Sequence, residues 1–167
     1  MRVQQGTGIP VRAYRRVGLA ALSVLALTTI HHIYGAIAYH TPWRLHVAVA
    51  APVAALAIVR ALYLAGSQRG TRSGARWTRI AAVIIFVLPV GMIGLIEGGY
   101  NHLAKNLVYY GVSARAARAL FPPPLYEMPD DLLFEASGIA QLPLALLAAW
   151  LTLSLLRRSA RAASESP

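Results

Sequence analysis

Cysteine is absent from this 167-residue sequence. The chain therefore has no disulfide framework, no thiolate metal site and no nucleophilic thiol. Charge is scarce too: charged residues make up 13% of the chain, and Lys105 is the one lysine beside fifteen arginines. Hydrophobic residues reach 57%, which is far too apolar for an ordinary soluble domain. A chain of this length suits one compact bundle, with no room for a second globular unit.

Several sequence motifs of known chemistry are also missing. The chain contains no serine nucleophile elbow, no phosphate-binding loop and no dinucleotide fingerprint. It also lacks the His-Glu-x-x-His pattern of zinc proteases and the Glu-x-x-His pairs of di-iron bundles. These absences exclude the common soluble-enzyme classes that such motifs mark.

What the sequence does contain is long apolar runs, at about 17–38, 42–64, 79–97 and 131–156. At about 1.5 Å per helical residue, each run can cross a bilayer core of about 30 Å. Thr41 and Pro42 favour a helix start, and the pair Gly98-Gly99 should end the third run. The runs predict an all-α integral membrane protein, a four-transmembrane-helix bundle spanning residues 17–156.

The segment between the third and fourth runs, residues 98–130, differs in composition. Tyr100 to Tyr110 can form a short amphipathic helix, and Ser113 can cap a second one that ends before three consecutive prolines at 122–124. The apolar and aromatic side chains of this segment would be costly to leave in water. We therefore expect short helices here, docked over the bundle as a periplasmic cap.

The arginines predict the orientation. Twelve of the fifteen lie in the N-terminal segment 1–16, around the loop 65–79 and in the C-terminal tail 157–167, where Glu165 is the only acid. Basic loops stay on the cytoplasmic side, which predicts an N-in/C-in protein of a bacterial inner membrane. The alternative for the first run is a secretory signal cleaved after Ala36-x-Ala38, but the run is long for one. Because the arginines flank apolar runs, nucleic acid is not an expected partner.

Four of the five histidines fall between His31 and His46. Helical rise places His31, His32, His46, Glu97 and Glu135 in the outer part of the four spans, at similar depth. Ionisable groups inside a membrane are costly and mark functional sites. His31 and His32 point about 100° apart, so we expect at most one to face the bundle axis, with His32 slightly favoured.

Mixed imidazole and carboxylate ligands without sulfur suit Zn, Fe, Mn or Cu(II). The metal-ligand candidates are His31, His32, His46 and His102. The catalytic candidates are Glu97 and Glu135, and Tyr39, Asn101 and Gln141 are candidates to hold a cofactor or substrate oxygen. On one uninterrupted α-helix, Glu97 and His102 would not share a face, so a break at Gly98-Gly99 is needed to bring them together.

The sequence leaves the function open among three classes. The first is binding of a transition metal ion or a metal-bearing cofactor, including a haem with His32 and His46 as axial ligands. The second is metal-free acid–base chemistry on, or binding of, a lipid- or quinone-like molecule. The third is an accessory or structural subunit of a membrane complex. In that class, the ionisable side chains at similar depth join the helices to each other and to a membrane-protein partner. Whether the protein is an enzyme is not decided by these residues.

Overall fold

The computed structural model describes residues 9–164, and all of its regular elements are helices. They are α1 (Val11–Ala38), η1 (Pro42–Leu45), α2 (His46–Ser67), α3 (Arg72–Ile85), η2 (Phe86–Ala104), α4 (Lys105–Gly111), α5 (Ala114–Leu120) and α6 (Leu132–Ser164). Residues 1–8 of the expected basic N-terminus and 165–167 of the expected tail lie outside the described part.

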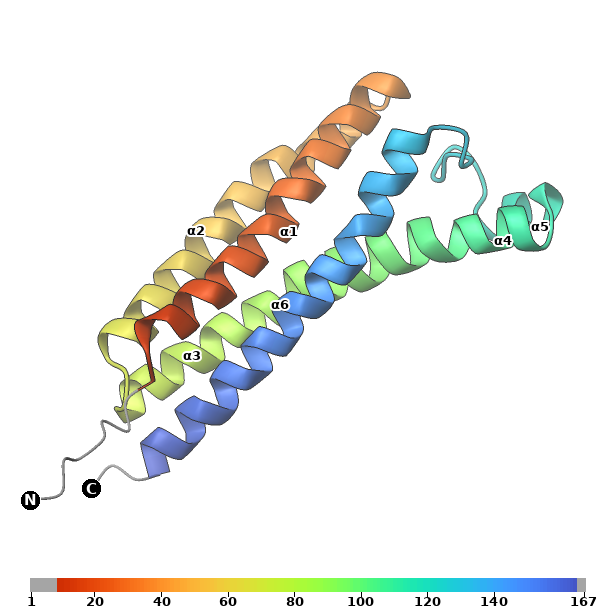
Figure 1. Ribbon diagram of the computed structural model, residues 1–167. Coiled ribbons are helices and arrows are strands. Elements are labelled where there is room, and N and C mark those ends of the chain that lie inside the picture. The colour runs from red at the N-terminus through yellow and green to blue at the C-terminus, as the bar shows by residue number, and fades with distance from the viewer. Residues whose placement is uncertain (1–8, 165–167) are drawn as a thin grey trace, which may run out of the picture.

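Four helical segments are long and apolar enough to cross a membrane: Val11–Ala38, Pro42–Ser67, Arg72–Gly111 and Leu132–Ser164. They form a bundle in which the two ends of the described chain lie at the same end (Figure 1). Large apolar side chains such as Ile37, Leu56 and Trp150 are exposed along these helices, as expected of surfaces that contact lipid. The four-helix, all-α prediction is therefore confirmed at this level.

The third span differs from the prediction. The elements α3, η2 and α4 follow one another without a break from Arg72 to Gly111, so the expected end at Gly98-Gly99 is wrong. The residues from Phe86 to Ala104 form a π-helix, whose hydrogen bonds join residues five apart rather than four. The first short helix expected beyond Gly99 is thus the end of this span, and only α5 is separate from it.

Glycines allow the third span to approach α6 closely. A Cβ atom added at Gly94 would lie 2.2 Å from the Cβ of Ala145, and one at Gly98 would lie 2.9 Å from the backbone nitrogen of Leu142. Small residues at such positions are typical of packed membrane helices. The close contact aligns η2 with the first half of α6.

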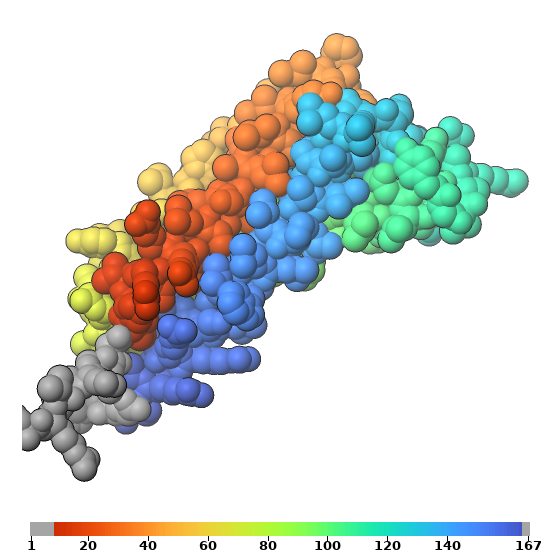
Figure 2. Space-filling view, viewed as in Figure 1, coloured from red at the N-terminus to blue at the C-terminus, as the bar shows by residue number. Residues whose placement is uncertain are grey.

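The apolar core fills the half of the bundle nearest the termini. It includes Tyr14, Val17, Ile58, Ile85 and Leu155, contributed by α1, α2, α3 and α6. Thr78, Thr152 and Ser159 are also buried within this half, whereas the buried histidines and the buried charged residues lie toward the opposite end, where the end of α1, η2 and the start of α6 meet. The segment α4–α5 extends beyond the bundle at that end, as the space-filling view also shows (Figure 2).

Asp131 organises the start of α6. Its carboxylate accepts a hydrogen bond from the backbone N–H of Phe134 at 2.9 Å and one from the Tyr34 hydroxyl at 2.6 Å. The Tyr34 hydroxyl, and then the Phe134 N–H, hold the pKa of Asp131 below its usual range. Asp131 therefore caps the helix and joins it to α1, a structural role.

Candidate functional site

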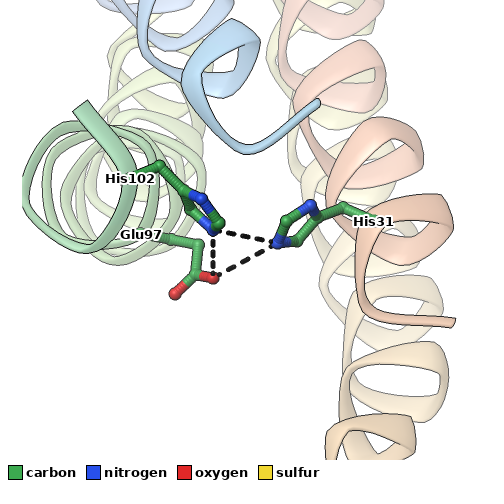
Figure 3. Close-up of side chains that lie close together, drawn as sticks. All are labelled: His31, Glu97 and His102. Atoms are coloured by element: carbon green, nitrogen blue, oxygen red, sulfur yellow. Dashed lines mark hydrogen bonds and ion pairs between the residues drawn. The ribbon is translucent and has the colours of Figure 1, made fainter. Parts of the chain in front are cut away.

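Three ionisable side chains from two helices converge in the half of the bundle opposite the two ends of the described chain. Figure 3 shows Glu97 and His102 extending from η2 toward His31 on α1. The Nε2 atoms of His31 and His102 are 3.1 Å apart. The Oε1 atom of Glu97 lies 3.5 Å from His31 Nε2 and 3.4 Å from His102 Nε2. Each of these three atoms can donate a lone pair to a metal ion. Together they form a nearly equilateral triangle, which we call the donor triangle.

The π-helix explains why Glu97 and His102 meet. Residues five apart are separated by about 140° around an α-helix, but stand one turn apart in a helix with i→i+5 hydrogen bonds. The expectation that these two side chains could meet only across a helix break is therefore wrong. Unusual π-helical geometry is frequent at functional sites, and here it brings together two of the three atoms of the donor triangle.

Hydrogen bonds on the far side of each ring determine which nitrogen carries the proton. His102 Nδ1 lies 2.9 Å from Glu135 Oε2, and a carboxylate can only accept, so Nδ1 of His102 is the donor. His31 Nδ1 lies 3.0 Å from the hydroxyl oxygen of Ser137, which itself donates to the carbonyl of Phe134. When the Ser137 hydroxyl donates its one proton to the Phe134 carbonyl, His31 Nδ1 is also the donor, and the two neutral rings both present unprotonated Nε2 lone pairs to the donor triangle.

Glu135 stands behind His102, and both of its carboxylate oxygens accept hydrogen bonds. Its Oε1 accepts from Lys105 Nζ at 2.7 Å, and its Oε2 also accepts from Asn106 Nδ2. Lys105 is only 2% exposed and donates to the backbone carbonyl of Glu127 as well. Because a buried charge is stable only when paired and hydrogen-bonded, this pair fixes Glu135 firmly against the His102 ring.

Three further residues hold the donor triangle in place. Asn101 donates from Nδ2 to Glu97 Oε2 at 2.8 Å, so that the other carboxylate oxygen faces the histidines. Gly138 leaves room for the His102 ring, because a Cβ atom there would lie 2.3 Å from its Cγ. The ring of Phe134 stacks on His31, with ring centroids 4.2 Å apart.

His32 lies beside the donor triangle but outside it. Its Nε2 is 3.9 Å from Glu97 Oε1, and its Nδ1 lies 2.9 Å from the carbonyl of Thr28. Both consecutive histidines thus approach Glu97, contrary to the expectation that only one would face inward. His31, which is fully buried, belongs to the donor triangle. The sequence had slightly favoured His32 for the inward-facing position.

The remaining sequence candidates are not brought to the donor triangle. The ring of His46 is 6.5 Å from that of His32, and its Nδ1 interacts with the carbonyl of Trp43. Tyr39 directs its hydroxyl toward Asp130 at 3.5 Å, and burial, followed by the nearby carboxylates, raises the pKa of that hydroxyl. Gln141 is fully buried beside Gly98, with neither amide atom hydrogen-bonded.

Sequence reasoning missed the supporting residues Ser137 and Asn106. Neither stands out by type or spacing, since serine and asparagine are common near helix ends. Lys105 did carry a signal, because it is the only lysine and follows His102 by three residues. In the structure Lys105 pairs with Glu135.

A cavity of about 440 Å³ adjoins the site. Glu97, His102 and His32 form part of its wall, together with Arg44 and Lys105. Residues 125–127 of the segment before α6 cover its outer end. The donor triangle is therefore buried within the bundle on the side of His31, and it adjoins the cavity on the side of Glu97 and His102.

Comparisons with protein-family models, with curated proteins and with solved structures find no match for this chain. The function is therefore inferred from the geometry of the site alone.

Proposed function

We propose that this protein is a multi-pass membrane protein that binds one transition metal ion, with His31, Glu97 and His102 as ligands. The observation that carries the proposal is the donor triangle. A tetrahedral zinc ion with bonds of about 2.0–2.1 Å keeps its ligand atoms about 3.3 Å apart. The three separations in this chain are 3.1, 3.4 and 3.5 Å.

The protonation pattern supports the same proposal. Two unprotonated imidazole nitrogens and a carboxylate oxygen facing one point repel one another unless a cation lies between them. A metal ion or a proton can fill that role, and the spacing favours the metal because the three separations differ by only 0.4 Å, from 3.1 to 3.5 Å. A shared proton would join only two of them in a hydrogen bond.

Two imidazoles and one carboxylate match the ligand set of open zinc sites, where a fourth position holds water or a substrate. The same set also occurs in non-haem Fe(II) sites of facial geometry. Zinc is the first choice because a facial octahedral arrangement would bring the ligand atoms closer, to about 3.0 Å. The cavity adjoining Glu97 and His102 supports a fourth position on that side.

In this proposal Glu135 is a positioning residue and not a catalytic acid. Metal-bound histidines commonly donate their other N–H to a carboxylate, which fixes the ring and strengthens its donor nitrogen. The Glu135 contact to His102 Nδ1 has that form, and Ser137 provides the equivalent contact for His31. Asn101 has the same function for Glu97.

We further propose that both termini face the cytoplasm of a bacterial cell, with the metal site in the outer half of the inner membrane. The support is the arginine distribution. Arg60, Arg69, Arg72 and Arg76 lie near the α2–α3 turn, at the bundle end where α1 begins and α6 ends (Figure 1). Positive residues concentrate on the cytoplasmic side of membrane proteins.

The test is elemental analysis and an absorption spectrum of the full-length protein purified in mild detergent. We expect one transition metal ion per chain and no Soret band. The variants His31→Ala, Glu97→Gln and His102→Ala should each lose the ion. The control His40→Asn changes an exposed histidine. The variant His46→Ala changes the histidine that the structure leaves outside the triangle. Both variants should retain the metal ion.

Helix content measured by circular dichroism separates loss of the ion from loss of the fold. A wild-type protein that keeps its helices yet binds none of Zn²⁺, Fe²⁺, Mn²⁺ or Cu²⁺ would contradict the proposal. That result would favour metal-free acid–base chemistry or a structural role. A Soret band lost in His46→Ala would instead select a haem.

A further inference from the structure

The cavity beside the donor triangle has a polar end and an apolar end. Arg44, His46, Glu97 and Lys105 line the outer part. Leu25, Ala54 and Leu88 line the inner part, each about two helical turns deeper than His32, His46 or Glu97 on the same helix. A volume of about 440 Å³ lies within the range of small-molecule sites. The shape suits an amphiphile with its head at the metal site.

The cavity opens toward lipid on one side. Among its lining residues, Met92 is 54% exposed on η2, and Ala50 is exposed on α2. The main packing partners of α2 are α1 and α3, so the outer part of α2 and η2 flank the opening. A hydrophobic chain can therefore enter from the bilayer without crossing water.

Arg44 is the cation best placed to bind a head group. It is buried and stacks near the Trp43 ring at 4.9 Å, while its Nε donates to Thr41. Its terminal nitrogen lies 3.7 Å from a Glu127 carboxylate oxygen, beyond hydrogen-bond distance. The guanidinium thus keeps N–H donors for a planar anion, which arginine binds in a two-pronged manner.

Charge balance selects the kind of head group. The positive charges of Arg44 and Lys105 are balanced by the negative charges of Glu127 and Glu135. The charges that remain unbalanced are those of the Glu97 carboxylate and of the metal ion. With a divalent ion bound, this end of the cavity carries one net positive charge, and without it one net negative charge. A monoanionic carboxylate is therefore attracted only by the metal-loaded site.

We propose that the cavity binds a long-chain fatty acid, with its carboxylate at the fourth metal position and against Arg44, and its chain along Leu25, Ala54 and Leu88. This inference rests on the proposed metal centre. It adds the class of ligand and the requirement for the ion, and it involves no bond making or breaking in the lipid.

The experiment uses the full-length protein in nanodiscs of neutral phosphatidylcholine, loaded with Zn²⁺ or stripped by a chelator. Palmitate binding is measured at equilibrium, with hexadecanol as the uncharged probe of the same chain length. We expect one saturable palmitate site per zinc-loaded chain, with affinity roughly tenfold or more above that of hexadecanol or of the stripped protein.

Variants test the two ends separately. Arg44→Gln should weaken palmitate binding roughly tenfold or more while zinc is retained. Ala50→Phe should obstruct the opening, whereas Ala57→Phe, an exposed position two turns along the same helix outside the cavity lining, should bind as the wild type does. Zinc content of each variant confirms that the site itself is intact.

Each outcome separates the two proposals. Zinc retention with equal binding of palmitate and hexadecanol, or with none, overturns the fatty-acid inference and leaves the metal centre standing. Palmitate binding that is unchanged after zinc removal also overturns it, because the charge argument then fails. A protein that retains its fold but not zinc refutes the metal centre and, with it, this inference.

Discussion

Replacing Gly138 with alanine is the most direct structural perturbation of the site. The added Cβ would lie 2.3, 2.4 and 2.5 Å from the Cγ, Cδ2 and Nδ1 atoms of His102. Ordinary contacts begin near 3.4 Å, so the ring must move by about 1 Å or the helices must separate. Either change breaks the hydrogen bond of His102 Nδ1 to Glu135, and losing a hydrogen bond that orients a metal ligand weakens metal binding about 10- to 100-fold.

The assay is competition for Zn²⁺ against a chromophoric chelator in detergent. Overpacking of this kind costs about 1–3 kcal/mol of stability, so helix content is measured alongside. The control is Gly111→Ala, where an added Cβ has no neighbour within 4 Å. If Gly138→Ala folds and binds zinc as tightly as the control does, His102 is not a ligand and the reasoning is refuted.

Four further predictions follow from the same contacts. Glu135→Gln should weaken zinc binding about 10- to 100-fold in the same competition assay, while Asp130→Asn, an exposed carboxylate, should not; equal effects would exclude a specific role for Glu135. Zinc affinity should fall as the pH is lowered, because imidazole and carboxylate ligands must be unprotonated to bind; affinity that does not change with pH would contradict the ligand set. Reporter fusions after residue 70 and at the C-terminus should report cytoplasm, and one at residue 115 periplasm; a cytoplasmic signal at 115 would overturn the orientation. Protease added to intact spheroplasts should cut slowly at residues 125–129, because Lys105 and Tyr110 bind the carbonyls of Glu127 and Pro129; rapid cutting would show that this segment is not docked.

The long helices were predictable because an apolar run long enough to cross a membrane has few ways other than a helix to satisfy its backbone hydrogen bonds there. Helical rise also placed His31, Glu97 and Glu135 at one depth, and the structure brings them within one connected set of contacts. Depth depends only on counting residues along a helix, which a sequence provides.

Helix rotation and helix type could not be predicted in the same way. The choice between His31 and His32 depends on how α1 rotates against η2 and α6, and a sequence does not show contacts such as that of Gly35 on α1 with the Phe134 ring on α6. The π-helix was not foreseen, because no residue pattern specifies i→i+5 bonding over 19 residues. The meeting of Glu97 and His102 follows from that helix type alone.

X-ray absorption of the zinc-loaded, full-length protein tests the central claim most directly. The donor triangle predicts a first shell of nitrogen and oxygen atoms at about 2.0–2.1 Å with the outer-shell scattering of two imidazoles. In His102→Ala, one imidazole should be lost from that signal. A zinc ion surrounded only by water oxygens, or the same imidazole signal in wild type and His102→Ala, would contradict a metal centre built from His31, Glu97 and His102.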